Sequence, residues 1–528
     1  MADRGLSALL AERAIGEQLL NYCRARDRCD IELLKSAFHS DGVLVADPPE
    51  PCGPITTCAM ALIDRDRRWR VQHHNLMNPL LCVVGHEAVS ETAAVIIRRA
   101  EGSAPGRWRD RHEYVRFLDR WSLRNGRWAV SRRQVIVDLA WTQDVEGGAL
   151  GQRARRNRDD PVYAHLGLGS AEDADTAATA GRPPETEMEA LSILKAERDI
   201  RRQLANYARG VDRFDPDTWK SVWHRDATLS YETGELDGVA HDKAFLMTFG
   251  HHLWAAHVHQ STRSAIRIRG ALAASETLNM AILHGYLDAQ GQSIQDHYRG
   301  RYLDRWERRD GHWAIVHRFT PRGGMWHQTV PAEVGAFMRR DRSDPSHALL
   351  GSLGRSDDDE LAVLEAERAI RQQIERHSRA LDRLDRSLLA SLWTDDGVLR
   401  DRDEGRDGEA RIQLGAWLEA LSRSASRLHR IAHSLIEIVR DEAVSETYFS
   451  SLLRGHPDAR GQVIDQHRRG RYLDRWTRRD GVWRLREREV VLDFAWTQSV
   501  ENPPADPDSR RGGTDPADAL FAGHFTVD

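Results

Sequence analysis

An aspartate and a histidine recur three times in this chain at one fixed separation. Each Asp precedes its His by 47 residues, although the stretch between them is the most variable part of each repeat. The pairs are Asp27 with His74, Asp212 with His259, and Asp382 with His429. A carboxylate that accepts the imidazole Nδ1–H fixes the tautomer of the ring and raises the basicity of Nε2. The pairs therefore suit general base catalysis, and they suit equally a buried hydrogen bond that holds a helix to a sheet.

Other polar residues recur at fixed distances from these pairs. A second His follows the first by 38 residues, an Arg ends the last strand of a predicted hairpin, and a Tyr stands five residues before the Asp in two repeats. The second histidines are His112, His297 and His467, the arginines are Arg133, Arg318 and Arg488, and the tyrosines are Tyr22 and Tyr207, with His377 in the third repeat. The second His could act as an acid or cap a surface strand, and the Arg could hold an anion or leaving group or simply be solvated. A Tyr near the pair suits proton donation to a departing hydroxyl or a developing enolate.

The residue four positions after each dyad His differs among the repeats. It is Asn78 in the first, Arg263 in the second and His433 in the third. We expect this position to contribute to substrate binding and to set specificity.

These residues belong to a repeat of domain size that occurs three times in the sequence. The string RYLDRW at 301–306 returns at 471–476, and a looser copy, RFLDRW, stands at 116–121. Alternation with a period of two on both sides of a charged turn that contains Gly predicts a β-hairpin. Each unit opens with an amphipathic helix, followed by a short helix after a capping Asp, so helices precede strands. This order predicts an α+β unit with helices packed on one face of a curved antiparallel sheet.

A chain of 528 residues is too long for a single hydrophobic core. We predict domains at 1–169, 188–351 and 360–528. The linker at 170–187 is rich in Ala, Asp, Glu, Gly and Pro, which predicts flexibility, and a shorter acidic linker spans 352–359.

The composition excludes several classes of function. A net charge of −5 in a chain with 30% charged residues argues against binding nucleic acid. The five Cys all lie in the first repeat without metal spacing, which fits a reducing cytoplasm, and no run approaches the length of a membrane span. The N-terminus lacks a signal-peptide pattern, so we expect a cytoplasmic protein. Without a metal motif, phosphate loop or nucleotide fingerprint, we expect no metal and no cofactor.

The combined pattern resembles the SnoaL-like branch of the NTF2-like superfamily. The motifs are Tyr-x4-Asp-Arg-x-Asp, Trp-x2-Asp-Ala-x-Leu, His-x3-Asn-Pro and Gly-Arg-Tyr-x-Asp-Arg-Trp-x3-Asp-Gly-x-Trp, and they cover nearly the whole chain. The branch holds the hexachlorocyclohexane dehydrochlorinase type, and the bile-acid 7α-dehydratase and scytalone dehydratase types are close to it. The resemblance implies a cone-shaped α+β barrel in each unit, with an apolar pocket at its open end.

The resemblance also implies roles for individual residues. In dehydrochlorinase-like members an Asp–His dyad abstracts a proton from the substrate, and the three Asp–His pairs match it in position and spacing. Arg133, Arg318 and Arg488 match an Arg that assists the leaving group. Tyr22 and Tyr207 match a Tyr of the bile-acid dehydratase type, whereas His377 departs from that pattern, and Arg263 departs from the usual Asn.

We therefore expect a cofactor-independent lyase or isomerase, resembling a dehydratase or dehydrohalogenase, that acts on a small hydrophobic molecule. One alternative is an NTF2-like module that binds a ligand or scaffolds partners without chemistry, and another is a polyketide cyclase. Several relatives are homotrimers, so three units in one chain imply an intramolecular pseudo-trimer within a monomeric chain. Three domains on flexible linkers remain the alternative arrangement.

Overall fold

The computed structural model covers most of the three predicted units. It describes residues 2–46, 51–102, 104, 106–146, 155–166, 184, 186–232, 234, 237–335, 338–354 and 358–500. The predicted linker at 170–187 falls almost wholly outside the described residues, as does the part of the third predicted domain beyond residue 500. In the part of the chain that is described, no helix has the length and apolar character needed to cross a membrane.

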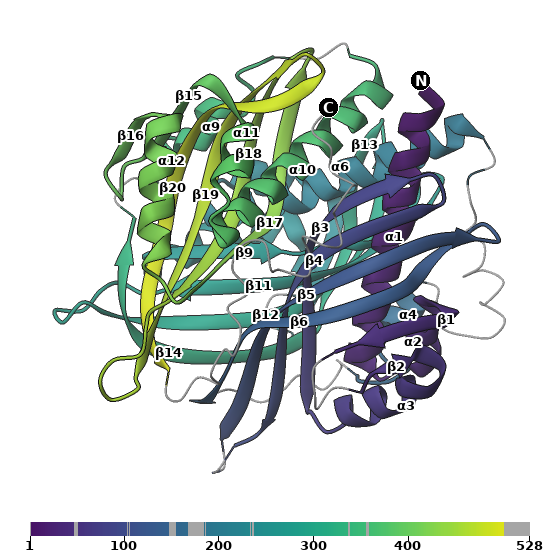
Figure 1. The fold of residues 1–528 in the computed structure, drawn as a ribbon, viewed down its shortest axis with the longest axis horizontal. Helices are drawn as coiled ribbons and strands as arrows, with labels where there is room; N and C mark the ends of the chain where they lie inside the picture. The colour runs from purple at the N-terminus through teal and green to yellow at the C-terminus, as the bar shows by residue number, and fades with distance from the viewer. Residues whose placement is uncertain are drawn as a thin grey trace.

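The three units repeat one order of elements (Figure 1). The first unit consists of α1 (Ala2–Arg28), α2 (Ile31–Ser36), β1 (Phe38–Val45), β2 (Gly53–Pro54), α3 (Ile55–Asp66), β3 (Val71–Val84), β4 (Glu87–Glu101), β5 (Arg107–Arg124), β6 (Arg127–Glu146) and α4 (Pro161–His165). The third consists of α10 (Glu360–Arg383), α11 (Arg386–Ser391), β15 (Trp393–Asp401), β16 (Arg406–Glu409), α12 (Ala410–Ser422), β17 (Ser426–Val439), β18 (Glu442–Arg454), β19 (Val463–Arg479) and β20 (Val482–Val500).

The second unit follows the same order with two strands interrupted. It consists of α6 (Glu187–Asp212), α7 (Pro216–Ser221), β7 (Trp223–Tyr231), β8 (Gly238–Val239), α8 (Ala240–Phe249), the 3-10 helix η1 (Gly250–Leu253), β9 (Ala256–Ser261), β10 (Ala265–Arg269), β11 (Leu272–His284), β12 (Gln292–Arg309), β13 (His312–Thr320), β14 (Arg322–Val334) and α9 (Pro345–Leu349). Pro321 separates β13 from β14, because proline lacks the N–H that a continuous strand pairing would use.

Local sequence signals explain the ends of these elements. The side chains of Asp30, Asp215 and Asp385 accept hydrogen bonds from backbone N–H groups in the first turns of α2, α7 and α11, so their predicted role as N-caps is confirmed. The predicted hairpin is also confirmed in each unit. Between β12 and β13 the turn residues Asp310 and Gly311 have φ angles of 50° and 80°, the left-handed conformations that a two-residue hairpin turn needs.

The α+β prediction is confirmed, with one change to the sheets. Within each unit the long strands pair antiparallel, as predicted. The first strand of each unit, however, runs parallel to the strand after the hairpin: β1 with β6, β7 with β13, and β15 with β20. A parallel pair is possible there because a helix and at least four other strands intervene in the chain, enough to carry it back.

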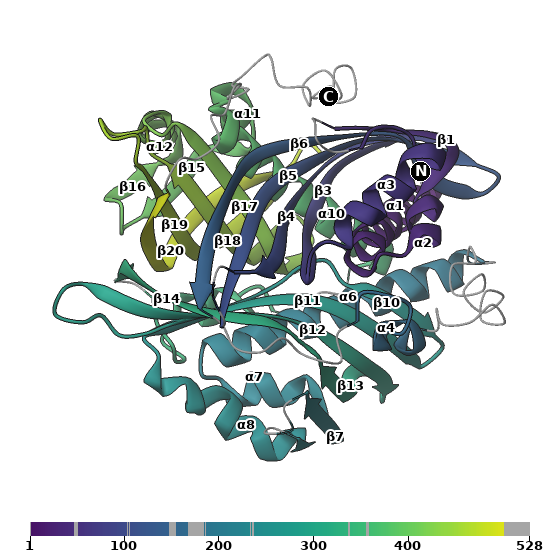
Figure 2. The ribbon, with the colours of Figure 1, turned by 90° about the horizontal axis from the view of Figure 1, so that it is seen from below.

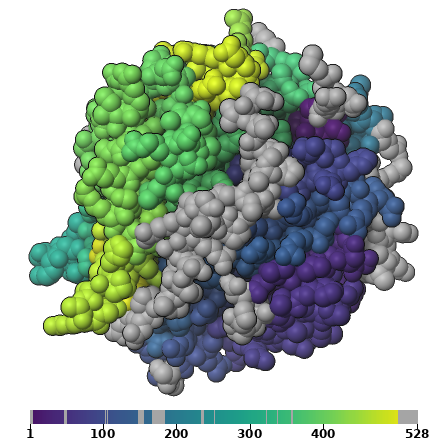
Figure 3. All heavy atoms as spheres, viewed as in Figure 1, coloured from purple at the N-terminus to yellow at the C-terminus, as the bar shows by residue number. Residues whose placement is uncertain are grey.

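The three units contact one another in cyclic order. Figure 2 shows their sheets converging toward the middle of the molecule, and Figure 3 shows the first and third units side by side on one face. Near the N-terminal parts of α1, α6 and α10, three ion pairs join each helix to the next. They are Arg13 with Glu197 at 2.6 Å, Arg198 with Glu367 at 2.6 Å, and Arg368 with Glu12 at 2.5 Å.

A second cyclic set of ion pairs uses a Glu on β4, β11 and β18. Arg28 of the first unit contacts Glu276 of the second, Arg209 of the second contacts Glu446 of the third, and Arg383 of the third contacts Glu91 of the first. All six side chains are at least nine-tenths buried. The units are therefore joined through charged groups withdrawn from water as well as through apolar surface.

Candidate active sites in the three units

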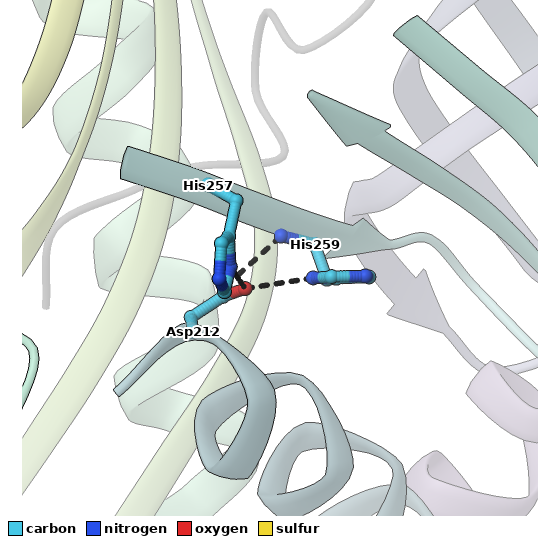
Figure 4. Close-up of side chains that lie close together, drawn as sticks. All are labelled: Asp212, His257 and His259. Carbon is cyan, nitrogen blue, oxygen red and sulfur yellow. Dashed lines mark hydrogen bonds and ion pairs between the residues drawn. The ribbon is translucent and has the colours of Figure 1, made fainter. Parts of the chain in front are cut away.

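In each unit the Asp at the end of the long helix is hydrogen-bonded to the dyad His on the facing strand. The distance from His Nδ1 to Asp Oδ1 is 2.5 Å for His74, 2.7 Å for His259 and 2.7 Å for His429. The backbone N–H of each His also donates to the same carboxylate, at 3.0, 2.9 and 2.8 Å. Figure 4 shows this arrangement in the second unit.

The two hydrogen bonds have different consequences. The bond to the backbone N–H fastens the last turn of the helix to the strand, which explains why the segment between Asp and His keeps its length. The bond from Nδ1 makes that nitrogen the protonated one and leaves the Nε2 lone pair available to accept a proton. The geometry is thus compatible with both interpretations of the pair, a hydrogen bond that holds helix to sheet and a general base.

The carboxylates of Asp27 and Asp212 stay ionised although they are buried. Burial by itself raises the pKa of Asp27, but the charge and hydrogen bonds of His74 outweigh it and hold that pKa below its usual value. The same balance, with contributions from His259 and His257, holds the pKa of Asp212 far below its usual value. An ionised Asp stabilises the imidazolium that forms when its His accepts a proton.

Each predicted Arg lies in the interior of its cone and is neither solvated nor at the surface. Arg133 donates from Nε and Nη2 to Asp119 at 2.7 Å each, and Arg318 and Arg488 pair in the same way with Asp304 and Asp474. In all three, the remaining Nη1 is buried without a hydrogen-bond partner among the described residues. Each unit therefore has one guanidinium N–H group without an acceptor among the described residues.

The tyrosines lie beneath these guanidinium groups. Arg133 lies 4.1 Å from the ring centre of Tyr22, and Arg318 lies 4.1 Å from that of Tyr207. The Tyr22 ring is 6.5 Å from the His74 ring, so dyad, Tyr and Arg share the interior of the first cone.

In the third unit, His377 takes the place of the Tyr and is fully buried among Trp393, Trp417 and Tyr472. Burial, with a smaller contribution from Arg488, holds its pKa well below the usual value, so it is neutral.

Two predicted sets line cavities that are shared among the units, and Arg263 also lines a cavity that reaches Asp27. His112, His297 and His467 gather where the three units meet and line one shared cavity of about 60 Å³. Asn78, Arg263 and His433 line a different cavity, of about 200 Å³, beside the three long helices. The structure thus brings each set together across units, through contacts that spacing within one unit does not specify.

A cavity of about 80 Å³ does reach one dyad residue. It lies between the first and second units and is lined by Asp27, His73 and Arg301, whereas His74 is not among its lining residues. The side chains of the dyad histidines differ in access, with exposed fractions of 0% for His74, 10% for His259 and 5% for His429.

The second site contains one further residue, His257, that was not predicted from the sequence. His257 Nδ1 lies 3.0 Å from Asp212 Oδ1, so one carboxylate oxygen accepts from two imidazoles. Ligand atoms of Asp212, His257 and His259 all lie within 4.8 Å of one another, and two imidazoles with a carboxylate are a donor set for zinc or iron. The signal was a His-x-His spacing on one strand, but the corresponding residues in the other units are Gln72 and Arg427.

Comparisons with known proteins agree with the repeat. The profile of the SnoaL-like domain matches residues 7–134, 192–319 and 362–489, which is more than half of the chain. Comparison with curated proteins gives no match.

Three solved structures illustrate the likeness of single units. A type 3 hexachlorocyclohexane dehydrochlorinase from Novosphingobium barchaimii LL02 is 20% identical over 26% of this chain and 93% of its own, with a TM-score of 0.23. A type 2 hexachlorocyclohexane dehydrochlorinase is 19% identical over 29% and 99%, with a TM-score of 0.23. A protein from Novosphingobium aromaticivorans DSM 12444, provisionally named a scytalone dehydratase, is 21% identical over 26% and 90%, with a TM-score of 0.23.

Proposed function

The chain belongs to the SnoaL-like domain family, and we propose that it is a cofactor-independent lyase or isomerase that abstracts a proton from a small hydrophobic substrate. The observation that carries the proposal is the dyad, which has the same Nδ1-to-carboxylate hydrogen bond in all three units. A dehydratase-like or dehydrohalogenase-like elimination is the reaction that the neighbouring groups suit best.

The proposed reaction begins at the Nε2 atom of the dyad His. This nitrogen removes a proton from a substrate carbon, while the Asp carboxylate stabilises the resulting imidazolium. The C–H electron pair forms a double bond, and hydroxide or halide leaves from the adjacent carbon. The free Nη1 of the Arg, and in the first two units the Tyr, bind the departing group as its negative charge develops.

The main alternative is a module that binds a ligand or scaffolds partners without chemistry. The backbone hydrogen bonds favour it, because the Asp would be retained for fastening helix to strand even without catalysis. A polyketide cyclase differs from the main proposal only in its substrate.

A triple variant separates these possibilities. His74→Ala with His259→Ala and His429→Ala removes all three bases but leaves each Asp able to accept the backbone N–H. We expect it to fold and to lose turnover on any compound of a hydrophobic alcohol and halide panel that the wild type converts. The matched control replaces an exposed His in each unit: His86→Ala, His312→Ala and His456→Ala. Turnover that persists in the triple dyad variant would contradict the proposed mechanism.

We also propose that the chain is a fused pseudo-trimer. The two cyclic sets of ion pairs support it, since each closes a ring through all three units. Small-angle scattering tests it: a compact monomer of 60.0 kDa is expected, and an extended profile with independent domains would contradict it.

A further inference from the structure

The cavity where the three units meet, here called the central cavity, is lined by the same residue types from each unit. It has a volume of about 60 Å³. Each unit supplies a His from the first strand of its hairpin and a Trp from a later strand: His112 and Trp141, His297 and Trp326, His467 and Trp496.

The rings of these residues form a closed cycle. Each His stacks on the Trp of its own unit, with centroids 4.7, 4.4 and 4.6 Å apart. Each His also meets the edge of a neighbouring Trp: His112 with Trp326 at 6.1 Å, His297 with Trp496 at 6.1 Å, and His467 with Trp141 at 6.0 Å. Six interlocked rings hold the wall of the cavity in one arrangement, so any ligand meets a preorganised site.

Hydrogen-bond donors around the cavity lack partners. The indole Nε1 atoms of Trp141, Trp326 and Trp496 are all buried with no acceptor in the described part of the chain. These side chains are 6%, 3% and 4% exposed, so water at the molecular surface does not satisfy them. Both ring nitrogens of His467 are likewise without a described partner. A buried N–H without an acceptor is costly. Trp219, Trp223 and Trp393 also carry such groups elsewhere, but here three equivalent ones belong to residues that line a single cavity.

Two arginines give the cavity positive charge. Arg299 and Arg469 both line it. The charge of Asp110 acts on Arg299, and Arg469 is hydrogen-bonded to the side chain of Tyr114. Arg299 lies 4.0 Å from the ring centre of Trp326, and Arg469 lies 5.1 Å from that of Trp496. The equivalent position in the first unit is Tyr114, which stacks on Trp141 with centroids 5.5 Å apart.

The electrostatic state of these groups follows from burial. Burial is the main cause that lowers the pKa of Arg299 to about 9, so the group is still charged at neutral pH. Burial, followed by the charges of Arg299 and Arg469, holds the pKa of His297 well below its usual value. The pKa values of His112 and His467 are likewise held well below the usual value by burial, so the three histidines are neutral, and Arg299 and Arg469 give the cavity positive charge.

We propose that the central cavity binds a small oxyanion, either inorganic phosphate or the carboxylate of a small organic acid. The anion would accept hydrogen bonds from the indole N–H groups and compensate the charge of Arg299 and Arg469. A volume of about 60 Å³ holds several water-sized groups, which suits a small oxyanion. The site is separate from the dyads and independent of the proposed elimination.

The test is thermal unfolding and calorimetric titration of the full chain with sodium phosphate and with sodium acetate. Sodium chloride at equal ionic strength is the salt control. We expect phosphate or acetate to raise Tm saturably, by roughly 1–3 °C beyond chloride. Phosphate alone would identify the inorganic anion, and acetate alone would identify a carboxylate ligand. No difference from chloride would overturn the proposal.

Variants assign the binding to the cavity. Arg299→Gln with Arg469→Gln should abolish the response and raise the Tm measured without anion, because two unpaired buried charges are removed. The matched control is Arg468→Gln, which neutralises the neighbouring residue on β19 that contacts Glu404. Trp496→Phe keeps the ring but removes one N–H, and should weaken binding about tenfold. A full response in the double Arg variant would contradict the assignment.

The dyad variant described above separates the two proposals. His74→Ala with His259→Ala and His429→Ala should bind the oxyanion as the wild type does, whatever happens to turnover. Loss of binding in that variant would contradict an independent site.

Discussion

The second and third units place the same dyad in different surroundings. In the second, Asp212 is fully buried and accepts from two imidazoles, those of His257 and His259. In the third, the side chain of Asp382 is 18% exposed and faces a single imidazole, while Arg430 Nη1 lies 3.3 Å from its other oxygen. The hydrogen bonds from His Nδ1 to the Asp are alike in the two units, so the units differ in the second group that contacts the carboxylate.

This difference shows which features of the unit are fixed and which are free. Helix end, strand and Nδ1 hydrogen bond recur because each supports the fold of the unit. The second partner of the carboxylate does not recur: it is the imidazole of His257 in the second unit and the guanidinium of Arg430 in the third. A permanent positive charge beside Asp382 offsets part of the field that the carboxylate exerts on His429. The units can therefore share a mechanism while differing in rate.

The largest expected effect is on activity, in variants that keep a single dyad. Removing the dyad His should lower kcat of its unit roughly 10²–10⁴-fold. The variant His74→Ala with His429→Ala leaves only the second dyad, and His74→Ala with His259→Ala leaves only the third. We expect the second dyad to be the faster, because Arg430 competes for Asp382. Steady-state kinetics on one substrate measures this, and equal rates would show that Arg430 has no influence.

A smaller effect is expected on stability when the carboxylates are removed. Asp212→Ala leaves two imidazole N–H groups and one backbone N–H buried without their acceptor, which should destabilise by roughly 3–5 kcal/mol. Asp382→Ala should cost about 1–2 kcal/mol, because water reaches that carboxylate more readily. Thermal unfolding of the two variants compares them directly. A larger loss for Asp382→Ala would mean that its pairing with Arg430 matters more than burial.

The smallest expected effect concerns the pH dependence of stability. The pKa of Asp212 is lowered in the folded state, so its contribution is present above the unfolded pKa of about 4 and is lost as pH falls below it. Asp212→Asn removes this dependence. Between pH 4 and pH 3 the wild type should lose about 1 kcal/mol more stability than the variant. Asp159→Asn, at an exposed site, is the control, and parallel pH curves for wild type and Asp212→Asn would contradict the prediction.

The sequence by itself determined the features that depend on local spacing. The Asp–His pairs, the capping aspartates and the Asp-Gly hairpin turns follow from patterns within one unit, where each partner is reached by a fixed length of chain. Threefold repetition strengthened each pattern, since a residue that returns in every copy stands out from its neighbours. His257 had no such support, because Gln72 and Arg427 occupy its place elsewhere.

Only the tertiary structure decided what happens between units. The spacing allowed the second histidines to act as acids beside the dyads or to cap surface strands, and the structure places His112, His297 and His467 together at the central cavity. Asn78, Arg263 and His433 meet beside the long helices. Residues that touch there are separated by more than a hundred positions, and no periodicity within a unit encodes which strand faces a neighbouring unit. That choice depends on how three apolar and charged surfaces fit together, which is a property of the assembled fold.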